Sequence, residues 1–233
     1  MLTQSLIEVL RSVDTPTICN ALELATGGRS AHGFTYGTLI AAPCPMTPML
    51  GFARTARIRA MAPATDTPQQ LRARRLAYYR YVASTSPLLP TLVVMQDLDQ
   101  RPGTGSFWGE VNSAVHLALG VAGVLTNGSV RDLGDLAPTF PILAGSIGPS
   151  HAHVHVVDFG EPVEVFDLPV QHDTLLHADR HGAVAIPLDA LPLLPDCIRQ
   201  MQRKEAPLLK AARSPGFGVD AIEQAMRDAD DIH

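Results

Sequence analysis

Short apolar runs and amphipathic stretches alternate through the middle of the chain. The runs TLVVM (91–95), AGVLT (122–126) and PILAG (141–145) have the length of buried strands, and WGEVNSAVHLALG (108–120) has the spacing of a helix. Helices that alternate with short apolar strands indicate an α/β fold whose sheet contains parallel pairs.

The N-terminal region predicts two short helices, over residues 3–12 and 15–26. Asp14 is suited to the N-cap of the second helix and Pro16 to its first turn. The glycine pair that begins at Gly27 is suited to its end.

Two further elements are predicted before the central runs. Residues 28–50 are rich in Gly, Pro and small side chains and favour irregular loops, whereas residues 53–60 (ARTARIRA) alternate as a half-exposed strand does. Residues 66–84 predict a helix with a solvated basic side, which we interpret as a charged helix face and only secondarily as a partner surface. The basic residues of that side are Arg72, Arg74, Arg75 and Arg80.

Beyond the central runs the pattern changes to short β-rich segments separated by turn residues, which predicts a meander or a sandwich layer. Closer to the C-terminus, a helix with prolines is expected from residue 188 and a shorter helix near 218–229. We therefore divide the chain into N-terminal helices (1–27), an α/β core that carries the site (28–190) and a C-terminal helical segment (191–233). We expect the last segment to pack on the core or on a neighbouring subunit.

Composition narrows the class of protein. With 233 residues, 46% of them hydrophobic, the chain is long enough to bury a core, and its formal charge of −5 argues against nucleic-acid binding. The scattered Cys19, Cys44 and Cys197 indicate structural thiols in a reducing compartment. No segment reaches the ~20 apolar residues of a membrane helix and the start lacks a signal-peptide pattern, so we expect a cytoplasmic protein without a membrane partner.

Two loops after the central strands hold the candidate chemistry. The first, MQDLDQRPGTGSFWGE (95–110), carries Asp97, Asp99, Glu110 and several glycines before a helix N-terminus. Such a terminus offers unpaired N–H groups to a carboxylate or phosphate. Glycines that only turn the chain, with Glu110 meeting the helix dipole, would give the same pattern.

The second loop, VLTNGSVRDLGDL (124–136), places Arg131 beside Asp132 after an expected turn at Asn127-Gly128. One interpretation is a surface ion pair, or a helix cap formed by Asp132. The other is a ligand site, because Arg binds carboxylates bidentately and Asp is a hard ligand suited to Mg²⁺ or Mn²⁺. Adjacent side chains of an extended segment point to opposite sides, which favours contact with one ligand over contact with each other.

Three histidines alternate at His151, His153 and His155, and on a strand they would share one face. Such a trio can bind Zn²⁺, Fe²⁺ or Cu²⁺. We prefer a half-exposed strand with outward polar residues, because no nearby carboxylate completes a metal motif. The same preference applies to His177 and His181.

Gly109-Glu110 at a helix start, GVAGVLTNGSVRD (120–132) and DTLLHADRHGAVAIP (173–187) follow one another in this order. Together they resemble the family that contains the 4-hydroxy-4-methyl-2-oxoglutarate aldolases and the regulator of ribonuclease activity A. The resemblance covers roughly residues 15–190. The sequence departs from the family pattern at His172, where Gly is usual.

The resemblance implies a swivelling β/β/α-type layered domain with N- and C-terminal helical appendages, assembled as a homotrimer or a dimer of trimers. It implies a pyruvate aldolase that uses Mg²⁺ or Mn²⁺, bound directly by Asp132 and through water by Glu110. A C-terminal carboxylate of a neighbouring subunit also holds water in the family enzymes, and Glu205 is the candidate for it.

The resemblance also assigns the substrate contacts. Arg131 would contact the keto oxygen and the carboxylate of a small 2-oxo acid, and backbone N–H groups near the helix start would receive that carboxylate. The catalytic residues by this assignment are Arg131, Glu110 and Asp132, and the substrate-binding residues are Gly109, Glu110, Val111, Asn112 and Arg131.

The implied reaction is cleavage of a 4-hydroxy-2-oxo acid such as 4-hydroxy-4-methyl-2-oxoglutarate to pyruvate, and the same site could decarboxylate oxaloacetate. The chain's lysines, Lys204 and Lys210, lie outside the motifs, which disfavours a Schiff-base aldolase. The alternative is a non-catalytic regulator that binds a protein, as the family's ribonuclease E inhibitor does.

Overall fold

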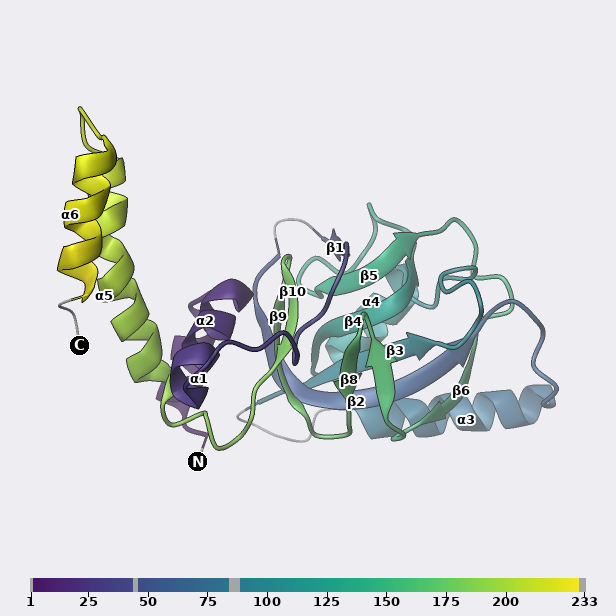
Figure 1. Cartoon of the computed structure of the whole chain (residues 1–233). Helices are drawn as coiled ribbons and strands as arrows, with labels where there is room; N and C mark the ends of the chain where they lie inside the picture. The colour runs from purple at the N-terminus through teal and green to yellow at the C-terminus, as the bar shows by residue number, and fades with distance from the viewer. Residues whose placement is uncertain (1, 44–45, 84–88, 231–233) are drawn as a thin grey trace.

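Four parallel strands form the centre of the main sheet (Figure 1). They pair in sequence order and are β2 (Met49–Arg59), β3 (Thr91–Asp97), β4 (Val121–Val130) and β5 (Ile142–Ile147). The computed structural model describes residues 2–43, 46–83 and 89–230. The predicted α/β fold with parallel pairing is confirmed.

Antiparallel strands complete both sides of this sheet. β1 (Ile40–Ala42) pairs with β5 inside the segment that we expected to be irregular. The 11-residue β2 is long enough to pair with two strands along one edge, first β9 (Leu175–Asp179) and then β6 (His155–Phe159). β10 (Gly182–Ala185) pairs with β9 and ends the sheet.

Each face of the sheet is covered by a different layer. The hairpin of β7 (Val163–Val165) and β8 (Leu168–Val170) covers one face, and α3 (Pro68–Val82) and α4 (Glu110–Ala118) cover the other. Successive side chains of β3 alternate between the two layers: Leu92 packs on the hairpin side and Val93 on the helix side. The continuous apolar run of this strand follows from burial on both faces, and the layered β/β/α fold is confirmed.

Helices at the two ends of the chain form the appendages: α1 (Gln4–Arg11), α2 (Thr15–Thr26), α5 (Leu194–Ala212) and α6 (Val219–Asp230). Asp14 caps α2 by accepting a hydrogen bond from the Thr17 amide, and Gly27 ends it at a φ of 79°, as predicted. α1, α2 and the first part of α5 share a core with β9 and β10.

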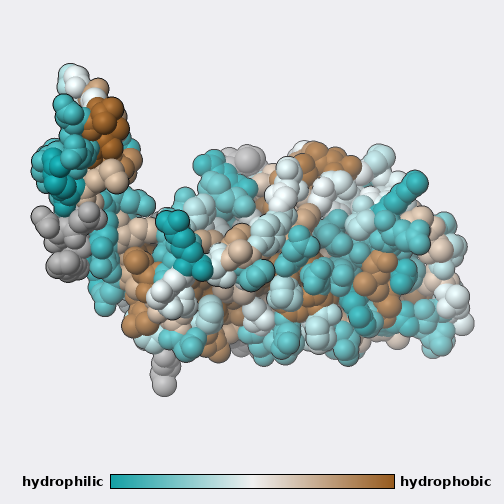
Figure 2. All heavy atoms as spheres, in the orientation of Figure 1, coloured by the Kyte–Doolittle hydropathy of each residue, from teal (hydrophilic) through white to brown (hydrophobic). Residues whose placement is uncertain are grey.

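The outer part of α5 and all of α6 stand off the body as a helical hairpin (Figure 1). Hydrophobic residues are exposed on this hairpin (Figure 2); Phe217 and Val219 lie at the connection between its helices and Met226 lies farther along α6. The chain itself therefore leaves apolar surface of the C-terminal segment uncovered.

The prediction of a turn at Asn127-Gly128 is wrong. β4 continues through both residues to Val130, and its pairing with β5 shifts register between Thr126 and Ser129. Asn-Gly here forms part of an irregularity within the strand, which extends the strand to the candidate site.

Within the described ranges, none of the helices has the length and apolarity to cross a membrane. Cys19 and Cys197 are free, half-buried thiols, and burial raises the pKa of Cys19 to about 11. Cys44 lies outside the described residues.

Candidate functional site

The start of α4 and the end of β4 meet at one place. Trp108 forms a parallel bridge with Val130, and its carbonyl accepts a hydrogen bond from the Arg131 amide at 3.0 Å. The next residues are therefore side by side, and the Glu110 amide donates to Asp132 Oδ2 at 3.2 Å. The structure thus brings together the two motifs that the sequence separates.

Residue 109 must be a glycine because neighbouring side chains lie close to its Cα, and not because of its backbone angles. Its φ of −170° is extended, which any residue can adopt. A Cβ at this position would lie 2.5 Å from Asp132 Oδ2 and 3.1 Å from Arg131 Cγ. A side chain here would displace the side chains of both residues.

The expectation that Arg131 and Asp132 point to opposite sides is wrong. Asp132 has a φ of 55°, a left-handed conformation that Asp tolerates, so the chain is not extended there. The carboxylate turns back to lie with Oδ2 3.6 Å from Arg131 Nε. Both side chains remain about one-third exposed and can therefore also contact a ligand.

The acidic groups fit a cation that keeps most of its water. Among the described residues, no three His, Cys, Asp or Glu side chains are grouped as metal ligands, so a closed zinc-type site is not formed. The half-exposed Asp132 carboxylate lies beside the amide of the exposed Glu110. One or two hard carboxylates are what Mg²⁺ or Mn²⁺ needs when waters and substrate fill the other positions.

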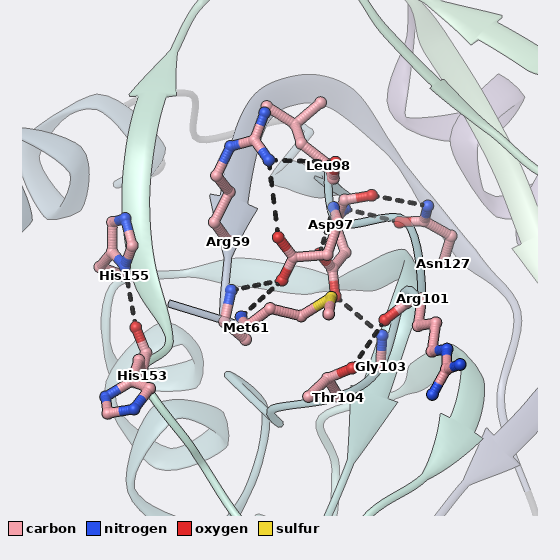
Figure 3. A network of polar contacts seen from close by, with 12 residues as sticks. Arg59, Met61, Asp97, Leu98, Arg101, Gly103, Thr104, Asn127, His153 and His155 are labelled. Carbon is pink, nitrogen blue, oxygen red and sulfur yellow. Dashed lines mark hydrogen bonds and ion pairs between the residues drawn. The ribbon is translucent and has the colours of Figure 1, made fainter. Parts of the chain in front are cut away.

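The loop that leads to Gly109 is held by two buried carboxylates (Figure 3). Asp97 accepts hydrogen bonds from the Asp99 and Gly103 amides, at 3.0 and 2.8 Å, and burial raises its pKa. Asp99 Oδ2 accepts from the Ala60 and Met61 amides at 2.6 and 2.8 Å. These bonds assign both aspartates to loop structure rather than to ligand binding.

Asn127 has a role that the sequence did not indicate. Its Oδ1 accepts from the Asp97 amide at 2.7 Å and its Nδ2 donates to the Asp97 carbonyl at 3.1 Å (Figure 3). The side chain thus replaces backbone pairing where β3 and β4 diverge. No local pattern predicts this use, because it depends on the register of two strands.

A hydrogen-bonded pair behind the site fixes the first turn of α4. His116 and Tyr78 are fully buried, and burial lowers the pKa of His116 to about 4, so its ring is neutral. Nδ1–H donates to the Asn112 carbonyl at 2.6 Å, which leaves Nε2 to accept from the Tyr78 hydroxyl at 2.8 Å. α3 and α4 are thereby tied together.

The predictions for the arginines of α3 need one correction. Arg72, Arg75 and Arg80 are exposed as expected. Arg74 is half-buried instead, and both of its terminal nitrogens donate to the carboxylate of Asp66. Helical periodicity could not show this, since Asp66 precedes the helix and its position depends on the turn.

The three histidines of HAHVH do not share a strand face. Only His155 belongs to β6, whereas His151 and His153 lie in the turn before it, and no metal cluster is found there within the described residues. All three line a hollow that also contains Arg131. The strand interpretation was wrong because the turn at 151–154 delays the start of β6.

His177 is structural, as preferred. It is buried and links β9 to the N-terminal helices, with Nε2 3.1 Å from the Leu10 carbonyl and Nδ1 3.0 Å from Thr15 Oγ1. His181 pairs with Asp179 at 3.0 Å.

Glu205 lies on α5, in the part of the chain that stands off the body (Figure 1). It lines a different surface hollow from the one that contains Arg131. A single chain therefore does not bring Glu205 to Asp132.

Comparison with known proteins gives one family and several solved structures. The family description RraA-like: Aldolase/RraA matches residues 15–185. An uncharacterized protein from Pseudomonas syringae pv. tomato aligns with a TM-score of 0.71 at 19% identity, over 97% of this chain and 95% of that one. A structure described under novel cellulases from gut-associated microbes aligns with a TM-score of 0.71 at 14% identity, over 88% of each chain.

A third structure is Streptomyces coelicolor RraAS2, described as an unusual member of the RNase ES inhibitor RraA protein family. It aligns with a TM-score of 0.63 at 19% identity, over 91% of this chain and 98% of that one. These identities show a shared fold. Comparison with curated proteins gives no match.

Proposed function

The chain belongs to the RraA-like family, which includes aldolases and non-catalytic ribonuclease inhibitors, and from this premise we propose that it is a divalent-metal-dependent lyase. Its substrate would be a 4-hydroxy-2-oxo acid such as 4-hydroxy-4-methyl-2-oxoglutarate, cleaved to pyruvate, with oxaloacetate decarboxylation as a side activity. The observation that carries the proposal is the convergence of the Glu110 backbone amide and the Arg131 side chain on the Asp132 carboxylate, beside Gly109.

Asp132 would hold Mg²⁺ or Mn²⁺ directly and Glu110 would hold it through water. When bound, the ion supplies positive charge beside the oxygens of a 2-oxo acid. The fit rests on the half-exposed Asp132 carboxylate and on the exposed Glu110 at the start of α4.

The start of α4 supports binding of the substrate carboxylate. Gly109 gives no side-chain cap, so among the described residues no side chain caps the amides of Val111 and Asn112 and they can donate to an anion, in addition to the field of the helix. Arg131 lies beside this terminus, and its guanidinium can bind a carboxylate bidentately. Both groups together would orient the 2-oxo acid.

Bond cleavage would use the same groups. Glu110 would take up the proton of the C4 hydroxyl through a water that it orients; the C3–C4 bond would then break, its electrons forming the pyruvate enolate while C4 becomes a carbonyl. Arg131 stabilises the negative charge that develops on the enolate oxygen. The same proton, passed back from Glu110 through water to C3, would then complete pyruvate.

The test follows pyruvate from 4-hydroxy-4-methyl-2-oxoglutarate or oxaloacetate by coupled oxidation of NADH. We expect activity with Mg²⁺, loss with EDTA, and a fall of at least ~10²-fold for Asp132→Asn. Arg131→Lys keeps the charge but loses the bidentate geometry, so it should retain only part of the activity. Activity that ignores EDTA, or that survives Asp132→Asn, contradicts the proposal; binding to a ribonuclease without any turnover supports the regulator instead.

We also propose a homotrimer or a dimer of trimers in which Glu205 of a neighbouring chain completes the site. The exposed apolar residues of the α5–α6 hairpin support an intersubunit contact. Light scattering gives the mass of the assembly. If Glu205→Gln leaves turnover unchanged in an intact oligomer, Glu205 has no part in the site.

A further inference from the structure

A hollow of about 590 Å³ opens beside Arg131, between α3, the first turn of α4 and the turn before β6. This size is within the ordinary range for small-molecule sites. Its charged and imidazole lining residues are Arg75, Arg131, His151, His153 and His155.

The charge of this lining is one-sided. Two arginines and three histidines line the hollow, and no Asp or Glu is among the described lining residues. Two permanent positive charges around one cavity favour a small anion. Arg131 already belongs to the proposed pyruvate site, whereas the proposed reaction gives no role to Arg75.

Arg75 is held in place without being neutralised. Its Cζ lies 5.6 Å from the centre of the Phe107 ring, within range of a cation–π contact. Its neighbour Arg74 has a carboxylate partner in Asp66, whereas Arg75 forms no ion pair with any residue in the described ranges. The guanidinium is therefore available to a ligand in the hollow.

Hydrogen bonds hold the helix that carries Arg75 in a fixed position relative to the helix start beside Arg131. Tyr79, one turn after Arg75 on α3, donates its hydroxyl hydrogen bond to Asn112 Oδ1 at 3.0 Å. Asn112 Nδ2 in turn donates to the Phe107 carbonyl at 2.5 Å. This chain of contacts joins the helix that carries Arg75 to the helix start beside Arg131.

We propose that Arg75 binds the distal carboxylate of a 2-oxo dicarboxylic acid whose pyruvyl end lies at Arg131 and Asp132. Arg75 is then the residue that selects dicarboxylic over monocarboxylic 2-oxo acids. This inference rests on the proposed function only for the placement of the pyruvyl end.

The experiment compares two non-cleavable acids of equal chain length, 2-oxoglutarate and 2-oxopentanoate, by calorimetry in the presence of Mg²⁺. They differ in a terminal carboxylate against a terminal methyl group, and neither has the 4-hydroxyl that cleavage requires. For Arg75→Gln we expect affinity for 2-oxoglutarate to fall about 10-fold, the scale of one charged hydrogen bond, and affinity for 2-oxopentanoate to change less than about 2-fold. Arg75→Lys should restore part of the preference.

Arg80→Gln is the matched control, since Arg80 is an exposed arginine of the same helix outside the hollow. The inference is overturned if the unmodified protein binds both acids equally or neither of them. It is also overturned if Arg75→Gln weakens both acids alike, or if Arg80→Gln gives the same selective loss.

The two proposals can fail separately. Selective 2-oxoglutarate binding that depends on Arg75, without turnover of any hydroxylated acid, retains this inference and removes the lyase. Turnover of 4-hydroxy-4-methyl-2-oxoglutarate and of 4-hydroxy-2-oxopentanoate that Arg75→Gln lowers equally retains the lyase and removes this inference.

Discussion

Replacing Gly109 with alanine tests whether close approach at this residue sets the geometry of the site. The added Cβ would lie 2.5 Å from Asp132 Oδ2, where ordinary van der Waals contact begins at 3.4 Å. The carboxylate must therefore move by roughly 0.9 Å, and a displacement near 1 Å costs on the order of 10²-fold in rate when it affects a catalytic group. We expect kcat/KM for pyruvate release to fall by about that factor.

Stability should change little in the same variant. The extended φ of Gly109 suits alanine, which by itself stabilises a fold by ~0.4–1 kcal/mol through the unfolded chain. The displaced Asp132 is about one-third exposed and has room to rotate, so the clash is relieved at the surface. Urea unfolding is expected to place the variant within about 1 kcal/mol of the unmodified protein.

Gly134→Ala is the control, because a Cβ there meets nothing within 4 Å although it lies two residues from Asp132. It should leave both turnover and stability unchanged. If Gly109→Ala keeps full activity, or if its loss of activity comes with global unfolding, the close approach at Gly109 does not position the catalytic groups.

Three further predictions concern hydrogen-bonded side chains around the site. The pKa of His116 is lowered from 6.5 to about 4, so between these pH values the unfolded chain binds a proton at this residue and the folded chain does not. The free energy of unfolding should therefore fall by up to about 3 kcal/mol as the pH drops from 6.5 towards 4. Urea unfolding across this range measures the fall, and His116→Phe should make the free energy of unfolding less dependent on pH. Asp99→Asn should lower stability by ~1–3 kcal/mol and reduce turnover, because charged hydrogen bonds that hold the loop are weakened; an unchanged denaturation midpoint would contradict this. Tyr79→Phe removes the hydrogen bond to Asn112 and should cost ~0.5–1.5 kcal/mol in thermal unfolding while weakening 2-oxoglutarate binding; equal melting curves and affinities would count against the tie.

The elements that the sequence predicted well are those with a complete local signal. α2 has its cap, its early proline and its terminal glycine within one segment, and the structure begins and ends it at Thr15 and Thr26. TLVVM is apolar on both faces because two layers cover β3. The continuation of β4 through Asn127-Gly128 was missed because strand pairing overrides a dipeptide that in isolation favours a turn.

The site shows the same division between local and non-local information. The motifs named Glu110, Arg131 and Asp132, and the parallel bridge between Trp108 and Val130 brings them together. The left-handed conformation of Asp132 was not predicted, because an aspartate tolerates several backbone regions and the surrounding contacts select one. Arg75 could not be distinguished from its neighbours, since its role depends on where α3 packs against Phe107.

The buried carboxylates of Asp97 and Asp99 order the loop that leads to Gly109 when the chain folds, before a ligand binds. Their carboxylates accept hydrogen bonds from the amides of Ala60, Met61 and Gly103, so the contacts that order this loop come from the protein itself. The entropy lost in ordering the loop therefore belongs to folding, and binding need not lower it again. A ligand should accordingly associate in a single step, with a heat capacity change that reflects only the surface it covers.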